Sequence, residues 1–187
     1  MKDNGLLVQY FTANTTDSQD LWKKAAEDAA VLKKMGATAV WFPPATKGAQ
    51  GKEDMGYAPY DLYDLGEFDQ KGSVGTRYGT KDEYIAAIKA MKDQGINVYA
   101  DIAVRQKLGA DRIEKVTAAD FNTKDIPQMI GNKKTVGALS KFTFPGRKSK
   151  YSKFKWNWKH FAGIDWKQEE FKKRVCALEG KDYDEAD

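Results

Sequence analysis

Four acidic residues fall within one short stretch of the chain and could in principle transfer protons. They are Asp61, Asp64, Glu67 and Asp69. Two carboxyl groups held close together can act as a general acid and a base or nucleophile, because each changes the proton affinity of the other. The same composition is typical of a solvated acidic loop. Since nothing in the sequence fixes the separation of these groups, we favour the solvated loop over a catalytic pair.

A second stretch interleaves basic and aromatic side chains. The lysines are Lys148, Lys150, Lys153, Lys155 and Lys159, and the aromatic residues among them are Tyr151, Phe154, Trp156 and Trp158. Lysines pair with phosphates and aromatic rings stack on bases, so nucleic-acid binding is one interpretation. In a strand, positions 154, 156 and 158 would share one face, which predicts instead a binding or packing surface. We favour that surface over a nucleic-acid site.

The only histidine and the only cysteine limit the chemistry further. His160 lies between aromatic residues, and we expect it to have a packing role. Cys176 cannot form a disulfide within the chain. No apolar run approaches the ~18 residues of a membrane span, and residues 1–5 lack the apolar core of a signal peptide. With 41% hydrophobic and 31% charged residues, the sequence predicts a folded cytoplasmic protein.

The charge of the chain is unevenly distributed. The net charge is +4 overall. Residues 1–104 carry 12 Lys/Arg against 15 Asp/Glu, whereas residues 105–175 carry 18 against 7. Residues 176–187 carry 1 against 5. The break near residue 105 indicates a module boundary.

The elements that would position these side chains alternate between strands and helices. We expect strands over 6–11, 39–42 and 96–102. The first helix should begin after an N-cap at Asp17 or Ser18 and run to about Met35, burying Leu21, Ala25, Ala29 and Leu32.

Thr80 and Glu83 form a capping box that opens a second helix, which should bury Ile85, Ile88 and Met91. This βαβαβ order predicts an α/β fold with a parallel sheet, and the long loop over 45–79 predicts function at the carboxyl ends of the strands.

A series of strings, in one order along nearly the whole chain, resembles the α-amylases of glycoside hydrolase family 13, in particular their bacterial liquefying and cytosolic branch. The strings are Val8-Gln9-Tyr10-Phe11, Val40-Trp41-Phe42-Pro43-Pro44-Ala45, Gly56-Tyr57-Ala58-Pro59-Tyr60-Asp61-Leu62-Tyr63-Asp64-Leu65-Gly66-Glu67-Phe68, Asp101-Ile102-Ala103-Val104, Phe142-Thr143-Phe144-Pro145-Gly146-Arg147 and Phe161-Ala162-Gly163-Ile164-Asp165-Trp166.

The resemblance implies a partial (β/α)8 TIM barrel. Residues 1–104 would supply the first three βα units of the catalytic barrel, and residues 105–187 an incomplete, domain B-like excursion. Three parallel strands would leave two open sheet edges and exposed apolar surface. The resemblance therefore also implies that another chain could complete the barrel.

The chemistry implied by the resemblance is retaining hydrolysis of α-1,4-glucans such as starch, glycogen and maltooligosaccharides, with a nucleophile and an acid carboxyl about 5 Å apart. The family's nucleophile, acid and helper carboxylates lie on later strands that nothing here matches, so we assign no catalytic residue. The expected function is an α-amylase-family protein that is inactive as this single chain, a truncated or pseudoenzyme form. The alternative is a non-catalytic module that binds glucan or another protein.

Four residues match positions that face the sugar in the family. Tyr57 would stack under a sugar ring, since an aromatic face suits a pyranose. Gln9 lies near that subsite on the first strand, and Asp101 ends the third strand and organises the site. Gln106 stands where the family places a sugar-bonding histidine. The expected ligand is an α-glucan or maltooligosaccharide.

Other positions depart from the family pattern. Ala13 replaces a sugar-facing aromatic residue. Arg105 stands in place of a calcium-binding asparagine, and Arg cannot coordinate a cation. Ala162 replaces another calcium ligand, whereas Asp184 matches one that is retained. The family calcium site is thus degraded, and we expect no cofactor.

Overall fold

The computed structural model describes residues 5–12, 15, 18–122, 128–167 and 172–180, with side chains outside 121–131 and 165–175. The chain has two compact units. Unit 1 is built from residues 1–109 and 145–151, and unit 2 from residues 110–144 and 152–187. The fold class is α/β, as predicted. The family-based boundary after residue 104 stays a prediction.

Unit 1 contains a three-stranded parallel sheet. Its strands are β1 (Leu7–Gln9), β2 (Ala39–Phe42) and β5 (Asn97–Ala100), in the order β1-β2-β5. The register places Gln9 opposite Trp41, and Trp41 opposite Tyr99. The predicted parallel βαβαβ arrangement is therefore confirmed over this part of the chain.

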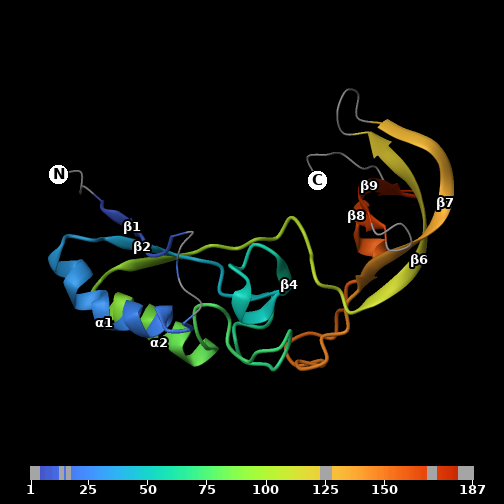
Figure 1. Cartoon of the computed structure of the whole chain (residues 1–187). Coiled ribbons are helices and arrows are strands. Elements are labelled where there is room, and N and C mark those ends of the chain that lie inside the picture. The colour runs from blue at the N-terminus through green and yellow to red at the C-terminus, as the bar shows by residue number, and fades with distance from the viewer. Residues whose placement is uncertain (1–4, 13–14, 16–17, 123–127, 168–171, 181–187) are drawn as a thin grey trace. The chain divides into compact units, whose positions relative to one another are not determined.

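Two helices pack together against one side of this sheet (Figure 1). They are α1 (Leu21–Lys34) and α2 (Lys81–Asp93). Trp22 from α1 and Tyr84 from α2 have ring centroids 4.7 Å apart, and both contact Phe42 of β2. This aromatic cluster removes a large apolar area from water and fixes the helices on the sheet.

The two helix starts differ from each other in how well the sequence predicted them. The capping box at Thr80 and Glu83 is present in both directions. The N-cap of α1, however, is Asp20, and its side chain makes no capping hydrogen bond. The prediction at Ser18 was wrong, because the Ser18 hydroxyl bonds the Asp20 carboxylate instead of a helix N–H. Asp17, the other predicted cap, lies outside the described residues.

The buried face of α2 is turned by one residue from the prediction. The residues that it buries are Tyr84, Ala87 and Met91, whereas Ile85 is 51% exposed and Ile88 is half-buried. Each helical residue turns the face by about 100°, so the choice of Tyr84 over Ile85 moves Ile85 toward solvent. Packing of Tyr84 on Trp22 decides the rotation. In α1 the predicted Ala25, Ala29 and Leu32 are buried, and Trp22 replaces Leu21 in the core.

The edge strands of this sheet carry exposed apolar side chains, as predicted. Leu7 on β1 and Tyr99 on β5 are more than half exposed. Ile102 and Val104, which follow β5, are also exposed. Within the described residues, β1 and β5 each pair with β2 alone. Both edges therefore keep free hydrogen-bonding capacity beside apolar surface.

The long loop between β2 and α2 is ordered rather than open. It holds a short antiparallel pair, β3 (Lys47–Gly48) and β4 (Pro59–Asp61), and a 3₁₀ turn over Gly51–Glu53. Residues 145–151 return to this loop, since Arg147 bonds Asp61, 86 residues earlier in the chain.

Unit 2 is an antiparallel sheet of four strands. They are β6 (Arg112–Asn122), β7 (Gln128–Lys141), β8 (Gly163–Lys167) and β9 (Lys172–Leu178), in the order β7-β6-β9-β8. Figure 1 shows β6 and β7 as a long curved hairpin. The core of this sheet consists of Val116, Ala118, Val136, Ala138, Cys176 and Leu178.

The aromatic segment of unit 2 is not a strand. Residues 152–157 have no regular structure, and a 3₁₀ turn over Trp158–His160 follows. The predicted single face of rings at 154, 156 and 158 was therefore wrong. The Phe154, Trp156 and His160 rings instead cluster within 4.8–5.6 Å, and the His160 ring also caps the turn by accepting the Asn157 N–H. This confirms a packing role for His160.

Candidate functional site

The tyrosine predicted to meet a sugar is anchored by its hydroxyl and keeps its ring accessible. The Tyr57 Oη donates a 2.7 Å hydrogen bond to Oδ2 of Asp101. The Asp101 backbone is fixed in turn, because its N–H donates to the carbonyl of Phe42 at the end of β2. Tyr57 remains 41% exposed. An amphipathic ring held at one end in this way offers its face to a ligand.

Two of the other predicted residues lie differently around this pair. The Gln106 side chain donates from Nε2 to the Tyr57 carbonyl at 2.8 Å, so it joins the cluster. Gln9 shares a sheet face with Tyr99 and, by the two-residue period of strands, with Asp101. Strand β1, which carries Gln9, lies two strand spacings from β5, about 10 Å. The Gln9 amide donates to the Phe11 carbonyl. The structure thus joins Tyr57, Asp101 and Gln106, and leaves Gln9 beside them without a bond.

The loop that carries Tyr57 is shaped by Asp54, which the sequence analysis did not single out. Asp54 Oδ1 accepts the N–H of Gly56 at 2.8 Å and of Ala58 at 3.4 Å, while Oδ2 accepts the N–H of Gln50. Asp is typical of such local turns, so Asp54 two residues before a glycine was the available signal. Gly56 has a φ of +91°, and a Cβ there would lie 2.6 Å from Pro44 Cβ.

Burial and charge both raise the pKa of the Tyr57 hydroxyl. Removal from water contributes most, followed by the hydrogen bond to the Asp101 carboxylate. The phenol is therefore a hydrogen-bond donor at neutral pH rather than a base. This favours an orienting role in the site.

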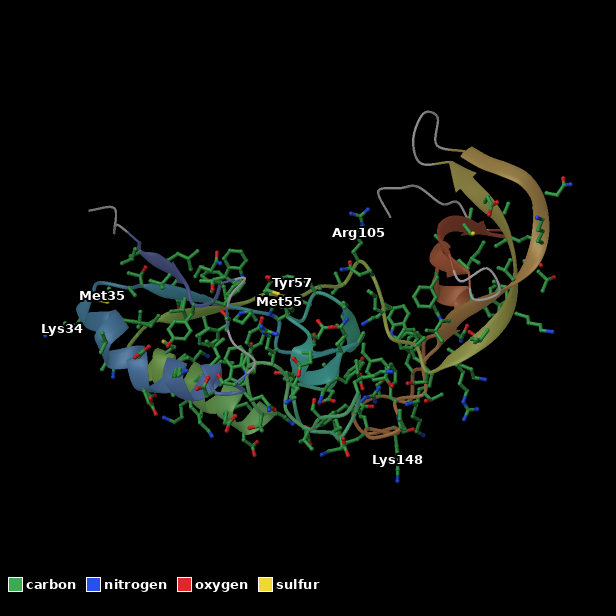
Figure 2. The ribbon with its side chains drawn as sticks, viewed as in Figure 1. Lys34, Met35, Met55, Tyr57, Arg105 and Lys148 are labelled. Atoms are coloured by element: carbon green, nitrogen blue, oxygen red, sulfur yellow. The ribbon has the colours of Figure 1, made fainter. Side chains whose placement is uncertain are left out.

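Figure 2 labels the surroundings of this cluster. Tyr57 and Met55 lie together, and the Arg105 side chain extends outward from the ribbon. The Tyr78 hydroxyl donates to the Met55 carbonyl at 3.0 Å, and burial raises the pKa of Tyr78 to about 12. A buried tyrosine therefore supports the main chain just before Tyr57.

Two of the four acidic residues depart from the solvated loop that we favoured, whereas Asp69 is exposed as predicted. Asp61 and Asp64 are buried, and the Gln70 amide donates to both. Asp61 also accepts from Arg147 Nε at 2.7 Å. Asp64 accepts the N–H groups of the following turn and faces the ammonium of Lys47 at 3.7 Å. The prediction failed at Asp61 and Asp64 because each faces a basic residue outside the acidic stretch, Arg147 and Lys47 respectively.

These carboxylates are also unsuited to catalysis. Each oxygen of Asp61 and Asp64 already accepts a hydrogen bond inside the unit, so neither can reach a bound sugar. Glu67 is paired with Lys81 and Lys150 and accepts from Tyr151. Those partners hold the pKa of Glu67 at about 2, so it is not a general acid at neutral pH.

Several lysines of the basic segment have aromatic or acidic partners inside the protein. Lys150 pairs with Glu67, Lys155 lies 4.9 Å above the Phe144 ring, and Lys159 lies 6.0 Å above Trp158. Of these contacts, the ion pair with Glu67 offsets one positive charge of the segment.

The degraded calcium site that the resemblance implies stays a prediction. Arg105 brings a positive charge and Ala162 has no side-chain oxygen. Asp184 lies outside the described residues. Among the residues that are described, no three His, Cys, Asp or Glu side chains gather as a metal would require. Over the same residues, no helix combines the length and apolar character of a membrane span.

Comparison with solved structures defines the class of fold. The chain is similar to a truncated alternansucrase from Leuconostoc mesenteroides, with a TM-score of 0.59 and 22% identity over 74% of this chain and 13% of that one. A second alternansucrase structure, in complex with isomaltotriose, gives a TM-score of 0.58. The likeness shows a shared α/β architecture. No protein-family model matches the chain.

Sequence comparison gives the family. The chain is 46% identical to an α-amylase of Bacillus licheniformis over 97% of its own length and 35% of the relative's. It is 42% identical to the cytoplasmic α-amylase of Escherichia coli, over 87% of this chain and 33% of that protein. By sequence the chain belongs with the α-amylases of glycoside hydrolase family 13, which confirms the resemblance. It spans about a third of the length of these relatives.

Proposed function

We propose that the surface around Tyr57 contacts an α-1,4-glucan as part of an α-amylase-type retaining glycoside hydrolase. The observation that carries this proposal is the hydrogen bond from Tyr57 to Asp101, made by a tyrosine that remains 41% exposed. A pyranose presents an apolar face of C–H groups that stacks on such a ring. The names of the α-amylase relatives support the choice of ligand.

In this proposal each predicted residue has a separate task. Asp101 holds the Tyr57 ring in place and offers its second carboxylate oxygen to a sugar hydroxyl. Gln106 fixes the Tyr57 main chain. Gln9 lies on the same face of the sheet, and its amide is exposed and able to bond a second sugar hydroxyl. The sheet with α1 and α2 would be the first part of a (β/α)8 barrel, and unit 2 the domain B-like excursion.

We further propose that the single chain does not hydrolyse glucan. Asp61 and Asp64 are buried and bonded, and Glu67 is ion-paired, so none of them can serve as the acid or nucleophile. Incubation of the purified chain with soluble starch should release no reducing sugar, with and without added calcium. Release above that of a heat-inactivated sample would refute this part of the proposal. A cytoplasmic location is proposed with it, supported by the Escherichia coli relative.

A polypeptide carrying the remaining strands would complete the sheet. Support comes from the two open edges at β1 and β5 and from the exposed Leu7, Tyr99 and Ile102 beside them. Further parallel strands would bond these edges and cover the apolar side chains. Co-expression with a chain built from the last two thirds of the Bacillus licheniformis relative should give a one-to-one complex by size-exclusion chromatography. Two separately eluting chains would count against completion in trans.

The glucan site itself is tested by a two-dimensional amide spectrum recorded during addition of maltoheptaose. We expect shifts at residues 54–58, 101 and 106, and their loss in the Tyr57→Ala variant. The matched control is Tyr63→Ala, which removes a tyrosine 49% exposed in the same unit and should leave the shifts intact. Equal shifts in Tyr57→Ala and the unaltered chain would exclude Tyr57 as the contact.

A further inference from the structure

The side chain of Lys47 ends in a cage of oxygen atoms inside unit 1. Lys47 lies in β3 and is fully buried. Its ammonium donates to the carbonyls of Ser73 at 2.7 Å, Val74 at 2.6 Å and Phe68 at 3.2 Å. The carbonyl of Gly75 is 3.4 Å away and the Asp64 carboxylate 3.7 Å away.

The distances show that the main-chain carbonyls, rather than the carboxylate, are the primary partners. A direct charge-assisted bond between an ammonium and a carboxylate is about 2.8 Å long. The bonds to Ser73 and Val74 have this length, and the contact to Asp64 is about 1 Å longer. Five oxygens around one nitrogen exceed the three protons that an ammonium can donate. The arrangement is therefore closer to the oxygen shell of a bound cation than to a simple ion pair.

The cage consists of groups that would be costly to bury without a cation. Carbonyls 68, 73, 74 and 75 converge from one turn, and their partial negative charges repel each other. An isolated buried ammonium is also unfavourable. Burial lowers the pKa of Lys47, and the Asp64 carboxylate opposes that effect. The converging carbonyl oxygens thus require the ammonium, and the buried ammonium requires those oxygens.

We propose that these carbonyls and the Asp64 carboxylate form a cation-binding site that is filled by the protein's own Lys47 ammonium. The site takes a small primary ammonium ion when the lysine chain is removed. Its role is to hold the 68–75 turn against β3, whose partner β4 closes the loop that carries Tyr57. These contacts all lie within unit 1 and do not depend on glucan binding.

The first test uses the unaltered protein. A ¹H–¹⁵N spectrum tuned to side-chain ammonium groups at neutral pH should show a resonance for Lys47, because the oxygens around it shield its protons from exchange with water. The Lys47→Met variant identifies this signal by its loss. Ammonium protons of Lys47 that exchange as fast as those of the exposed Lys89 would overturn the inference.

The second test empties the site. Thermal unfolding of the Lys47→Ala variant is measured with increasing methylammonium, ethylammonium or propylammonium chloride, and with tetramethylammonium chloride at equal ionic strength. We expect a saturable rise of several degrees in Tm with ethylammonium and propylammonium, which fit the vacated volume and supply N–H donors. Tetramethylammonium, which has no N–H group, should give no such rise.

The controls separate a site from a general salt effect. Lys47→Met fills the space without a charge and should not respond to the alkylammonium ions, and Lys89→Ala removes an exposed lysine and should behave as the unaltered chain. If Lys47→Ala is unfolded alone, dispersed amide signals on addition of ethylammonium support the site. Absence of any rescue, or equal rescue by tetramethylammonium, overturns it.

Discussion

Tyr57 and Asp101 are joined by a 2.7 Å hydrogen bond across 44 residues of sequence. The bond ties the long loop after β2 to the carboxyl end of β5, so the orientation of the aromatic ring depends on the sheet rather than on the loop alone. A ring that is already oriented loses little entropy when a ligand stacks on it.

Changes at Tyr57 should separate stacking from anchoring. Tyr57→Ala removes the ring and should weaken maltoheptaose binding by up to about tenfold, since an aromatic stacking contact is worth about 0.5–1.5 kcal/mol. Tyr57→Phe keeps the ring and loses only the bond to Asp101, so we expect a loss of about two- to fivefold. Isothermal titration calorimetry measures both. A phenylalanine variant as weak as the alanine variant would assign the affinity to the hydroxyl instead.

The glycine before Tyr57 should tolerate no side chain. Gly56 has a positive φ, and a Cβ would lie 2.6 Å from Pro44 Cβ and 2.7 Å from the Pro44 carbonyl oxygen. Gly56→Ala should lower the free energy of unfolding by about 2–3 kcal/mol, measured by urea titration. Gly72 is the matched control, because it also has a positive φ but open space around it. Gly72→Ala should cost only about 1 kcal/mol. Equal losses would show that the contact with Pro44 is unimportant.

Removing one member of the buried pair of Arg147 and Asp61 should destabilise the fold more than replacing both members with apolar residues. Arg147→Met leaves the buried Asp61 carboxylate without its guanidinium partner, and we expect a loss of about 3–5 kcal/mol of stability. The double variant Arg147→Met with Asp61→Leu removes both charges and should recover a large part of that loss. Urea unfolding of the three chains gives the coupling energy. Additive losses would mean that the two charges do not depend on each other.

Stability should fall in alkaline solution through Tyr78. Burial raises its pKa from 10.0 in the unfolded chain to about 12 in the folded protein. The folded state therefore binds the phenolic proton more tightly, so the contribution to stability is complete below pH 10 and is lost as the pH rises from 10 to about 12. Tm measured across this range should fall less steeply in Tyr78→Phe than in the unaltered chain. Parallel curves would assign the alkaline loss to other groups.

Calcium should not stabilise the chain. Arg105 and Ala162 cannot supply the oxygens that the family's site would need. We expect the Tm to be unchanged by millimolar calcium or by a chelator, whereas a ligand that binds the folded state raises the Tm further as its concentration exceeds the Kd. A rise of the Tm with calcium that is reversed by the chelator would show that other residues bind the ion.

The regular elements of unit 1 could be predicted because their signals are local. Thr80 and Glu83 are three residues apart and cap each other, and the apolar β2 segment lies between a glycine and two prolines. The rotation of α2 could not be read in the same way. Tyr84 and Ile85 are both apolar neighbours, and only the position of Trp22, which lies on another helix, makes Tyr84 the buried one.

The candidate site was likewise predicted only in part. Tyr57, Asp101 and Gln106 were selected by resemblance, and two hydrogen bonds bring them together. The burial of Asp61 and Asp64 was missed, since the charges that neutralise them stand at positions 147 and 47. Hydropathy along the chain assigns every aspartate to the surface, because it contains no information on distant partners.

The bond between Asp61 and Arg147 also has a consequence for synthesis on the ribosome. Asp61 is made 86 residues before its partner, and the residues between them include the β6–β7 hairpin. At ordinary rates of translation this corresponds to roughly 4–17 seconds. During that interval the nascent chain can form α1, β2 and α2, but the Asp61 carboxylate lacks its guanidinium partner. The buried ion pair can therefore form only after residues 145–151 have left the exit tunnel.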